Sequence, residues 1–174
     1  MTLDSDVEHR AFIDLALEEA RKCTPSPTAF CVGCVITATT LSSPSKAVVI
    51  ATGYSREHEG NTHAEANALF NLRGVTPSAI SALLGTPETV ELEELLEMAD
   101  VYTTMEPCSV RTSGLAPCAD ALIAAGIRRC FIGVSEPPDF VKCEGADRIK
   151  AAGIEVIWVK GRESECLDVA RRGH

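Results

Sequence analysis

Three short motifs, far apart in the chain, constrain this sequence more than any other feature. His63-Ala64-Glu65 opens a predicted helix, Glu106-Pro107-Cys108 follows a predicted strand, and Pro117-Cys118 opens a second predicted helix. One imidazole and two thiolates suit a catalytic zinc, which keeps its fourth tetrahedral position open. A fold that holds this metal must therefore bring one strand end and two helix starts together.

We expect His63, Cys108 and Cys118 to bind one Zn²⁺ per chain, with Glu65 as the proton shuttle. Zinc lowers the pKa of a bound water to ~7, so a hydroxide can form near neutral pH. Glu65 lies two residues after His63, in the first helical turn, so its carboxylate can reach that water while His63 reaches the metal. The positive end of a helix dipole favours the thiolate of Cys118. A closed structural zinc site is the main alternative, but it leaves Glu65 without a role.

Helix and strand signals alternate along the chain. Amphipathic or capped segments predict helices over residues 7–22, 62–71, 117–125 and 146–152, and apolar runs predict strands over 31–37, 47–52, 100–105, 129–134 and 155–159. Thr62 is expected to cap the helix that follows it, with Glu65 completing a capping box.

This alternation predicts one α/β domain over residues 1–174, a three-layer α/β/α sandwich with a central five-stranded mixed sheet. Residues 75–99 are interpreted as a surface elaboration with an acidic helix, and 160–174 as a tail.

Charge and cysteine content narrow the class of protein. The net charge of −9 disfavours a nucleic-acid partner, because such partners require a basic surface. There is neither a long apolar span nor a signal-peptide pattern, which predicts a cytoplasmic protein with no membrane association. The eight cysteines are therefore expected to be reduced. Cys31 and Cys34 lie on a predicted strand, where their side chains point to opposite faces, so we interpret them as core residues rather than ligands.

An H-x-E motif followed by P-C-x-x-C marks zinc nucleobase deaminases, in which the glutamate is the general acid and base. Here nine residues separate Cys108 from Cys118, and this expanded loop resembles the pyrimidine deaminases of riboflavin biosynthesis. Val32–Ile36, Ala121–Ile127 and Ala151–Val156 resemble further segments of that family. The resemblance runs from about residue 9 to 159, except for the interval 75–99, which is peculiar to this chain, and it implies the cytidine-deaminase-like fold.

Two departures from the bacterial members concern the form of the enzyme. Those members carry Pro-Asn-Pro before the first strand, where this chain has Thr28-Ala29-Phe30, and they have a reductase domain for which 174 residues leave no room. Both features suit a stand-alone, fungal-type form. The resemblance implies hydrolytic deamination of 2,5-diamino-6-(ribosyl/ribityl)amino-pyrimidinone 5'-phosphate, with release of ammonia and no redox cofactor.

The phosphate of such a substrate needs local positive or hydrogen-bonding groups. We expect them in the cysteine loop, at Arg111, Thr112 and Ser113, and on the turn before the metal helix, at Arg56, His58 and Asn61. The resemblance also implies a homodimer.

Three alternatives remain open. A dCMP or cytidine-type nucleotide deaminase is compatible with Asn67 but not with the expanded loop. A tRNA or DNA base deaminase is disfavoured by the charge balance. A non-catalytic, deaminase-like subunit of a larger complex would have no need of Glu65.

Overall fold

A five-stranded mixed sheet forms the centre of the computed structural model, which describes residues 3–39, 46–111, 114–137 and 143–174. The strand order is β2-β1-β3-β4-β5. The strands are β1 (Gly33–Thr39), β2 (Ala47–Tyr54), β3 (Ala99–Met105), β4 (Arg129–Val134) and β5 (Glu155–Trp158). β1 runs antiparallel to both β2 and β3, whereas β3, β4 and β5 are parallel, as βαβ connections require. The predicted mixed sheet is confirmed.

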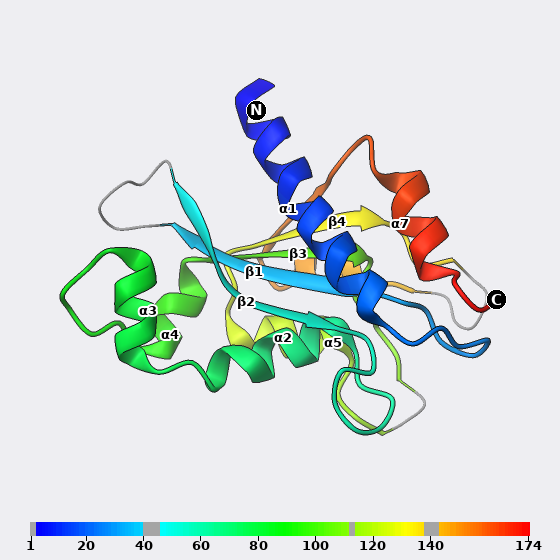
Figure 1. Ribbon diagram of the computed structural model, residues 1–174, viewed down its shortest axis with the longest axis horizontal. Helices are drawn as coiled ribbons and strands as arrows, with labels where there is room; N and C mark the ends of the chain where they lie inside the picture. The colour runs from blue at the N-terminus through cyan, green and yellow to red at the C-terminus, as the bar shows by residue number, and fades with distance from the viewer. Residues whose placement is uncertain (1–2, 40–45, 112–113, 138–142) are drawn as a thin grey trace.

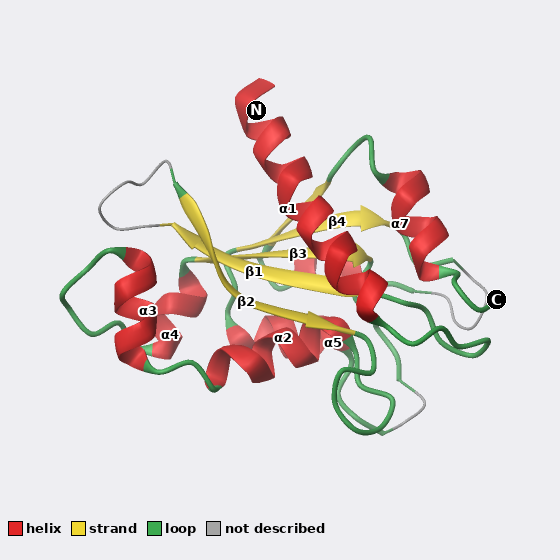
Figure 2. Cartoon of the chain, in the orientation of Figure 1, coloured by secondary structure: helices red, strands yellow, loops and turns green. Residues whose placement is uncertain are grey.

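Helices cover both faces of this sheet, which confirms the three-layer prediction (Figures 1 and 2). One face packs against α1 (Leu3–Lys22) and α7 (Glu163–Ala170). The other packs against α2 (Ala64–Arg73), α3 (Pro77–Leu84), α4 (Leu92–Glu97), α5 (Cys118–Ala125) and α6 (Gly145–Ala151). None of the helices in the described ranges is both long and apolar enough to cross a bilayer.

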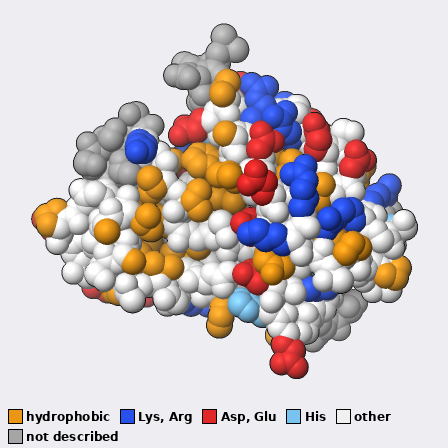
Figure 3. All heavy atoms as spheres, in the orientation of Figure 1, with side chains coloured by type: hydrophobic (Ala, Val, Ile, Leu, Met, Phe, Trp, Pro, Cys, Tyr) orange, Lys and Arg blue, Asp and Glu red, His pale blue; other side chains and the backbone are white. Residues whose placement is uncertain are grey.

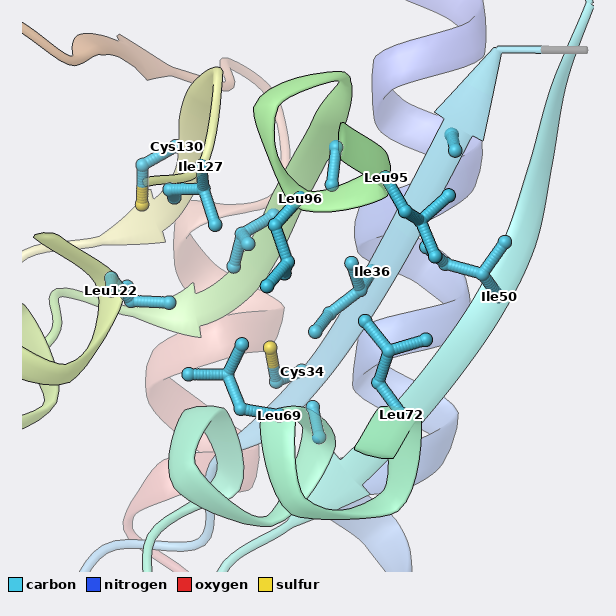
Figure 4. Packing of buried hydrophobic residues seen from close by; sticks show 14 of the residues in the cluster. Cys34, Ile36, Ile50, Leu69, Leu72, Leu95, Leu96, Leu122, Ile127 and Cys130 are labelled. Carbon is cyan, nitrogen blue, oxygen red and sulfur yellow. The ribbon is translucent and has the colours of Figure 1, made fainter. Parts of the chain in front are cut away.

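Strand alternation assigns each core side chain to one of the two layers. Val35 of β1 faces the cluster around α1, while its neighbours Cys34 and Ile36 face the cluster around α2. Figure 4 shows Leu69 and Leu72 of α2 on the side of β1 that carries Cys34 and Ile36. The helix that covers this face of β1 is therefore the one whose first turn carries Glu65.

Gly33 explains why α1 can lie directly on β1. A Cβ at this position would lie 1.9 Å from the Ala16 carbonyl oxygen and 2.4 Å from the Ala20 amide nitrogen. Both atoms are helix backbone and cannot rotate away, so a side chain here would separate the two elements.

The expected capping box at Thr62 is wrong. His63 is the N-cap residue of α2, with no side-chain capping hydrogen bond. The Thr62 hydroxyl instead donates to the His58 carbonyl oxygen (3.3 Å) and accepts from the Asn67 side-chain amide (3.0 Å). The Glu65 side chain points into the interior, where it accepts a hydrogen bond from Thr103 of β3 instead of bonding to the backbone at the start of its own helix.

Residues 75–99 form two helices, α3 and α4, rather than a single acidic one. Thr76 caps α3 through a hydrogen bond from the Ala79 amide, and Gly85 ends it with a φ of 67°. Their inner residues, Ile80, Leu84, Leu95 and Leu96, belong to the same buried cluster as β1 and α2. This segment therefore extends the main core while its outer face carries the acidic residues.

The C-terminal residues, interpreted from the sequence as a tail, contain α7, which packs on α1, β3 and β4. The Cys31 amide donates to the Ala170 carbonyl oxygen (2.9 Å), and Arg162 pairs with Asp14 of α1. The surface seen in Figure 3 intersperses Lys and Arg side chains with Asp and Glu, so this face does not present the uniform basic area typical of a nucleic-acid binder.

Candidate active site

The three predicted metal ligands meet in one place. His63 lies at the start of α2, Cys108 follows the end of β3, and Cys118 is the first residue of α5. The His63 Nδ1 atom lies 3.4 Å from Cys108 Sγ and 3.5 Å from Cys118 Sγ. All three ligand atoms lie within 4.8 Å of one another, and no other set of three or more His, Cys, Asp or Glu residues with this geometry was found in the described ranges.

The charge of the two thiols shows what this site can hold. The Cys118 amide donates to Cys108 Sγ (3.3 Å), and the Cys118 thiol, followed by His63, lowers the pKa of Cys108 to about 4. The pKa of Cys118 is raised well above its usual value by the hydrogen bond with Cys108 and by burial. The lowered pKa of Cys108 favours its thiolate, which is a negative charge in a buried place. A divalent cation offsets that charge, and one nitrogen with two sulfurs is a donor set that zinc prefers.

All eight cysteines are free, as predicted for a reduced protein. Cys34 is fully buried in the main core cluster. Cys31 lies just before β1 rather than on it, and its sulfur accepts from an Arg56 guanidinium nitrogen (3.3 Å). Neither residue contributes to the ligand group.

Glu65 lies in the first turn of α2, beside the ligands. Its side chain is buried at 3% exposure, and its Oε1 atom accepts a hydrogen bond from the Thr103 hydroxyl of β3 (3.1 Å). Burial, followed by the negative charge of Cys108, raises the pKa of Glu65. A carboxyl group in this state holds a proton more readily than one in water.

One pocket joins the ligands to the surface. Its wall contains His63, Cys108 and Glu65. The rest comes from the segment before β1, the β2–α2 loop, the end of β3, the cysteine loop and the end of β4. These residues are Thr28, Ala29, Phe30, Val32, Ser55, Arg56, Asn61, Met105, Glu106, Val110, Arg111 and Glu136.

Two of the predicted substrate contacts, Arg111 and Asn61, lie side by side in this wall. The Arg111 guanidinium donates to the Asn61 carbonyl oxygen at 2.6 Å, which links the cysteine loop to the turn before α2. Arg56 also lines the pocket, but its guanidinium donates to the carbonyl oxygens of Thr24 (2.8 Å) and Phe30 (3.0 Å). Arg56 therefore braces the segment that carries the opposite wall.

The structure places His58 away from the pocket, contrary to expectation. Its Nε2 atom lies 3.1 Å from Asn71 Oδ1, and its ring packs edge-on against Phe70. Both partners belong to α2, so the local helix sequesters the imidazole. Thr112 and Ser113 lie outside the described residues.

Two carboxylates of the pocket were missed from the sequence. Burial raises the pKa of Glu136 to about 7, and Glu106 Oε1 accepts from the Ala146 amide at the start of α6 (3.0 Å). For Glu106 the available signal was its place in the Glu106-Pro107-Cys108 motif. Their shared pocket follows only from the parallel pairing of β3 with β4.

Comparisons with known proteins agree with this geometry. The family described as the cytidine and deoxycytidylate deaminase zinc-binding region matches residues 6–134. The diaminohydroxyphosphoribosylamino-pyrimidine deaminase of Schizosaccharomyces pombe is 40% identical over 168 residues, which cover 95% of this chain and 36% of that protein. The chain thus spans about a third of the length of this curated relative.

Two groups of solved structures are similar along nearly the whole chain. The Aspergillus oryzae Rib2 deaminase, a C-terminal deletion mutant, is 32% identical with a TM-score of 0.74, covering 95% of this chain and 92% of that one. The same protein has been solved in complex with DARIPP. The diaminohydroxyphosphoribosylaminopyrimidine deaminase/5-amino-6-(5-phosphoribosylamino)uracil reductase of Thermotoga maritima is 27% identical with a TM-score of 0.69, covering 95% of this chain and 40% of that one.

Proposed function

The chain belongs to the zinc-binding cytidine and deoxycytidylate deaminase family, and from this premise we propose that it deaminates a pyrimidine of riboflavin biosynthesis. The proposed substrate is 2,5-diamino-6-(ribosyl/ribityl)amino-pyrimidinone 5'-phosphate, and the second product is ammonia. The observation that carries the proposal is the group of His63, Cys108 and Cys118 beside buried Glu65, at a pocket whose wall includes His63, Cys108 and Glu65. The Aspergillus Rib2 deaminase solved with DARIPP supports this substrate class.

His63, Cys108 and Cys118 would hold one Zn²⁺ per chain. When bound, zinc supplies a Lewis acid that makes the attacking water acidic near neutral pH. Glu65 accepts one proton of that water and delivers it to the ring nitrogen next to the carbon that carries the amine, while the water oxygen bonds to that carbon. Glu65 then moves the remaining proton of that oxygen to the amine. The C–N bond breaks, ammonia leaves and the carbon keeps the oxygen as a carbonyl. Positioned acid–base groups of this kind contribute ~10²–10⁴-fold in rate.

Arg111 is our choice for the phosphate contact, because it lies on the pocket wall and is exposed enough to meet an anion. Asn61 would help by fixing the orientation of the Arg111 guanidinium through its carbonyl oxygen. The proposal also includes a homodimer and a cytoplasmic location, both of which follow from the family resemblance and the sequence.

A dCMP or cytidine-type deaminase is the alternative within the same chemistry. The cysteine loop argues against it, because this loop contributes Val110 and Arg111 to the pocket wall and so shapes the substrate site. A non-catalytic subunit is disfavoured by the buried, hydrogen-bonded Glu65.

The test is ammonia release by the zinc-loaded protein from the pathway pyrimidine in ribosyl and ribityl forms, dCMP, cytidine and cytosine. Turnover of a pathway pyrimidine alone supports the proposal, whereas turnover of dCMP alone replaces the substrate. Glu65→Gln should keep zinc and fold but lose about 10²–10⁴-fold in kcat. Exposed Glu59→Gln, on the β2–α2 loop just before this helix, is the matched control and should be fully active.

A further inference from the structure

The Thr103 side chain occupies an unusual place in β3. It is completely buried, and its hydroxyl lies 3.1 Å from Glu65 Oε1 and 3.0 Å from the Met105 carbonyl oxygen. Thr103 pairs with Cys34 of β1 and Ile132 of β4, both of which belong to the main apolar cluster. A polar side chain in such surroundings needs a hydrogen-bonding partner, and the partner here is the proposed proton shuttle.

A threonine hydroxyl has one proton to donate, and here it faces two acceptors. An ionised carboxylate accepts a stronger hydrogen bond than a neutral carbonyl, so Glu65 competes with the Met105 carbonyl oxygen for this proton whenever its carboxyl group is ionised. This bond fixes Oε1 on the rigid central sheet. The Glu65 side chain also lines the pocket, so an anchored Oε1 sets the direction in which the carboxylate faces it.

We propose that Thr103 is a positioning residue for deamination, which holds the Glu65 carboxylate so that its second oxygen faces the reacting water. This role rests on the proposed function, in which Glu65 carries the proton. Without the bond the carboxylate can rotate about its last torsion, which is broad for glutamate, and spends less time in the productive orientation. The loss falls on the chemical step rather than on substrate binding.

Two substitutions separate this role from a purely structural one. Thr103→Val keeps the volume and removes the hydroxyl, so kcat should fall about tenfold, the effect of losing one charge-assisted hydrogen bond, with KM and zinc content unchanged. Thr103→Ser keeps the hydroxyl and removes a methyl group, so it should lose thermal stability but restore most of kcat.

Thr104→Val is the matched control from the same strand. Thr104 is also fully buried, and its hydroxyl oxygen accepts from the Gly33 amide on the other side of β3, with no contact to Glu65. This variant should lose stability while kcat is retained. In a Glu65→Gln background, Thr103→Val should add no further loss of kcat, because the two residues act as one unit.

The outcomes distinguish this role from the proposed function. Wild-type kcat in Thr103→Val, or equal losses of kcat in Thr103→Val and Thr103→Ser, would overturn the positioning role while leaving the deaminase standing. An active Glu65→Gln would remove the proton shuttle and this role with it, and a wild-type protein that turns over none of the panel would overturn both proposals.

Discussion

Gly145→Ala is the substitution whose effect follows most directly from the geometry of the site. Gly145 is the first residue of α6 and lies against the carbonyl of Pro107, the residue before the ligand Cys108. A Cβ at Gly145 would lie 1.7 Å from the Pro107 carbonyl oxygen and 2.9 Å from its carbonyl carbon. Both atoms are backbone, so no rotamer change can relieve the overlap.

Relief requires α6 to move away from the strand end, and that movement breaks identifiable hydrogen bonds. The Ala146 amide donates to Glu106 Oε1 and the Glu144 amide donates to Ser109 Oγ, each at 3.0 Å. Each bond contributes about 1 kcal/mol, and overpacking alone costs about 1–3 kcal/mol. We therefore expect the free energy of unfolding to fall by about 3 kcal/mol or more. In a domain of this size that lowers Tm by about 6–12 °C.

Zinc affinity should fall as well, because the carbonyl that the new Cβ overlaps belongs to Pro107, directly before Cys108. The assay is a thermal melt of the zinc-loaded protein together with zinc retention against a chelator. Gly74→Ala is the control, since Gly74 has a φ of −83° and its nearest contact to a new Cβ is 3.3 Å, to the Asn71 carbonyl oxygen. It should change stability by less than about 1 kcal/mol. Equal Tm and equal zinc retention in the wild type and Gly145→Ala would refute the close-approach argument.

Three further perturbations have defined outcomes. Cys118→Ala should abolish stoichiometric zinc measured by elemental analysis whereas Cys31→Ala should retain it, and the reverse pattern would remove the ligand assignment. Asp100, at the start of β3, is 3% exposed and accepts from Arg128 and Arg129 at the start of β4. Asp100→Asn should therefore lower the free energy of unfolding by about 2 kcal/mol in a denaturant titration, and an unchanged midpoint would count against this ion-pair network. Burial, followed by the charge of Arg129, lowers the pKa of His9, so the neutral imidazole stabilises the fold above its ordinary pKa of 6.5 and this contribution is lost as pH falls below it. Between about pH 7.5 and about pH 5.5 the wild type should therefore lose more Tm than His9→Gln, and parallel losses would show that His9 does not contribute.

Much of the fold could be read from local patterns. The strand predicted over 129–134 coincides with β4, and the helices and strands that carry the ligands were placed within a few residues of their observed ends. Short apolar runs bounded by turn residues encode these elements locally, because side-chain period and backbone propensity act over a few residues. The segment 75–99 was harder to predict, because its many acidic residues indicated a surface helix although its inner leucines belong to the core.

The ligand group was predictable because metal chemistry restricts residue type and order so severely. Only Cys, His and acidic side chains bind zinc, and their places at strand ends and helix starts leave few arrangements. His58 shows the limit of this reasoning. His58 lies five residues before His63, on the loop that precedes α2. The Asn71 side chain, further along α2, nevertheless holds the His58 imidazole outside the pocket.

The sequence by itself therefore determined the element order and the sheet class, and it predicted the metal ligands and the proton shuttle, because these depend on local periodicity and on which side chains have the required chemistry. The tertiary structure alone decided which side chains from other elements lie beside these residues. Thr103 meets Glu65 because β3 pairs with β1, on which α2 packs. Glu136 joins the pocket because β4 runs parallel to β3, and Arg56 braces the segment before β1. These contacts join residues that are distant in the chain, and their energies arise only when burial removes water from both partners.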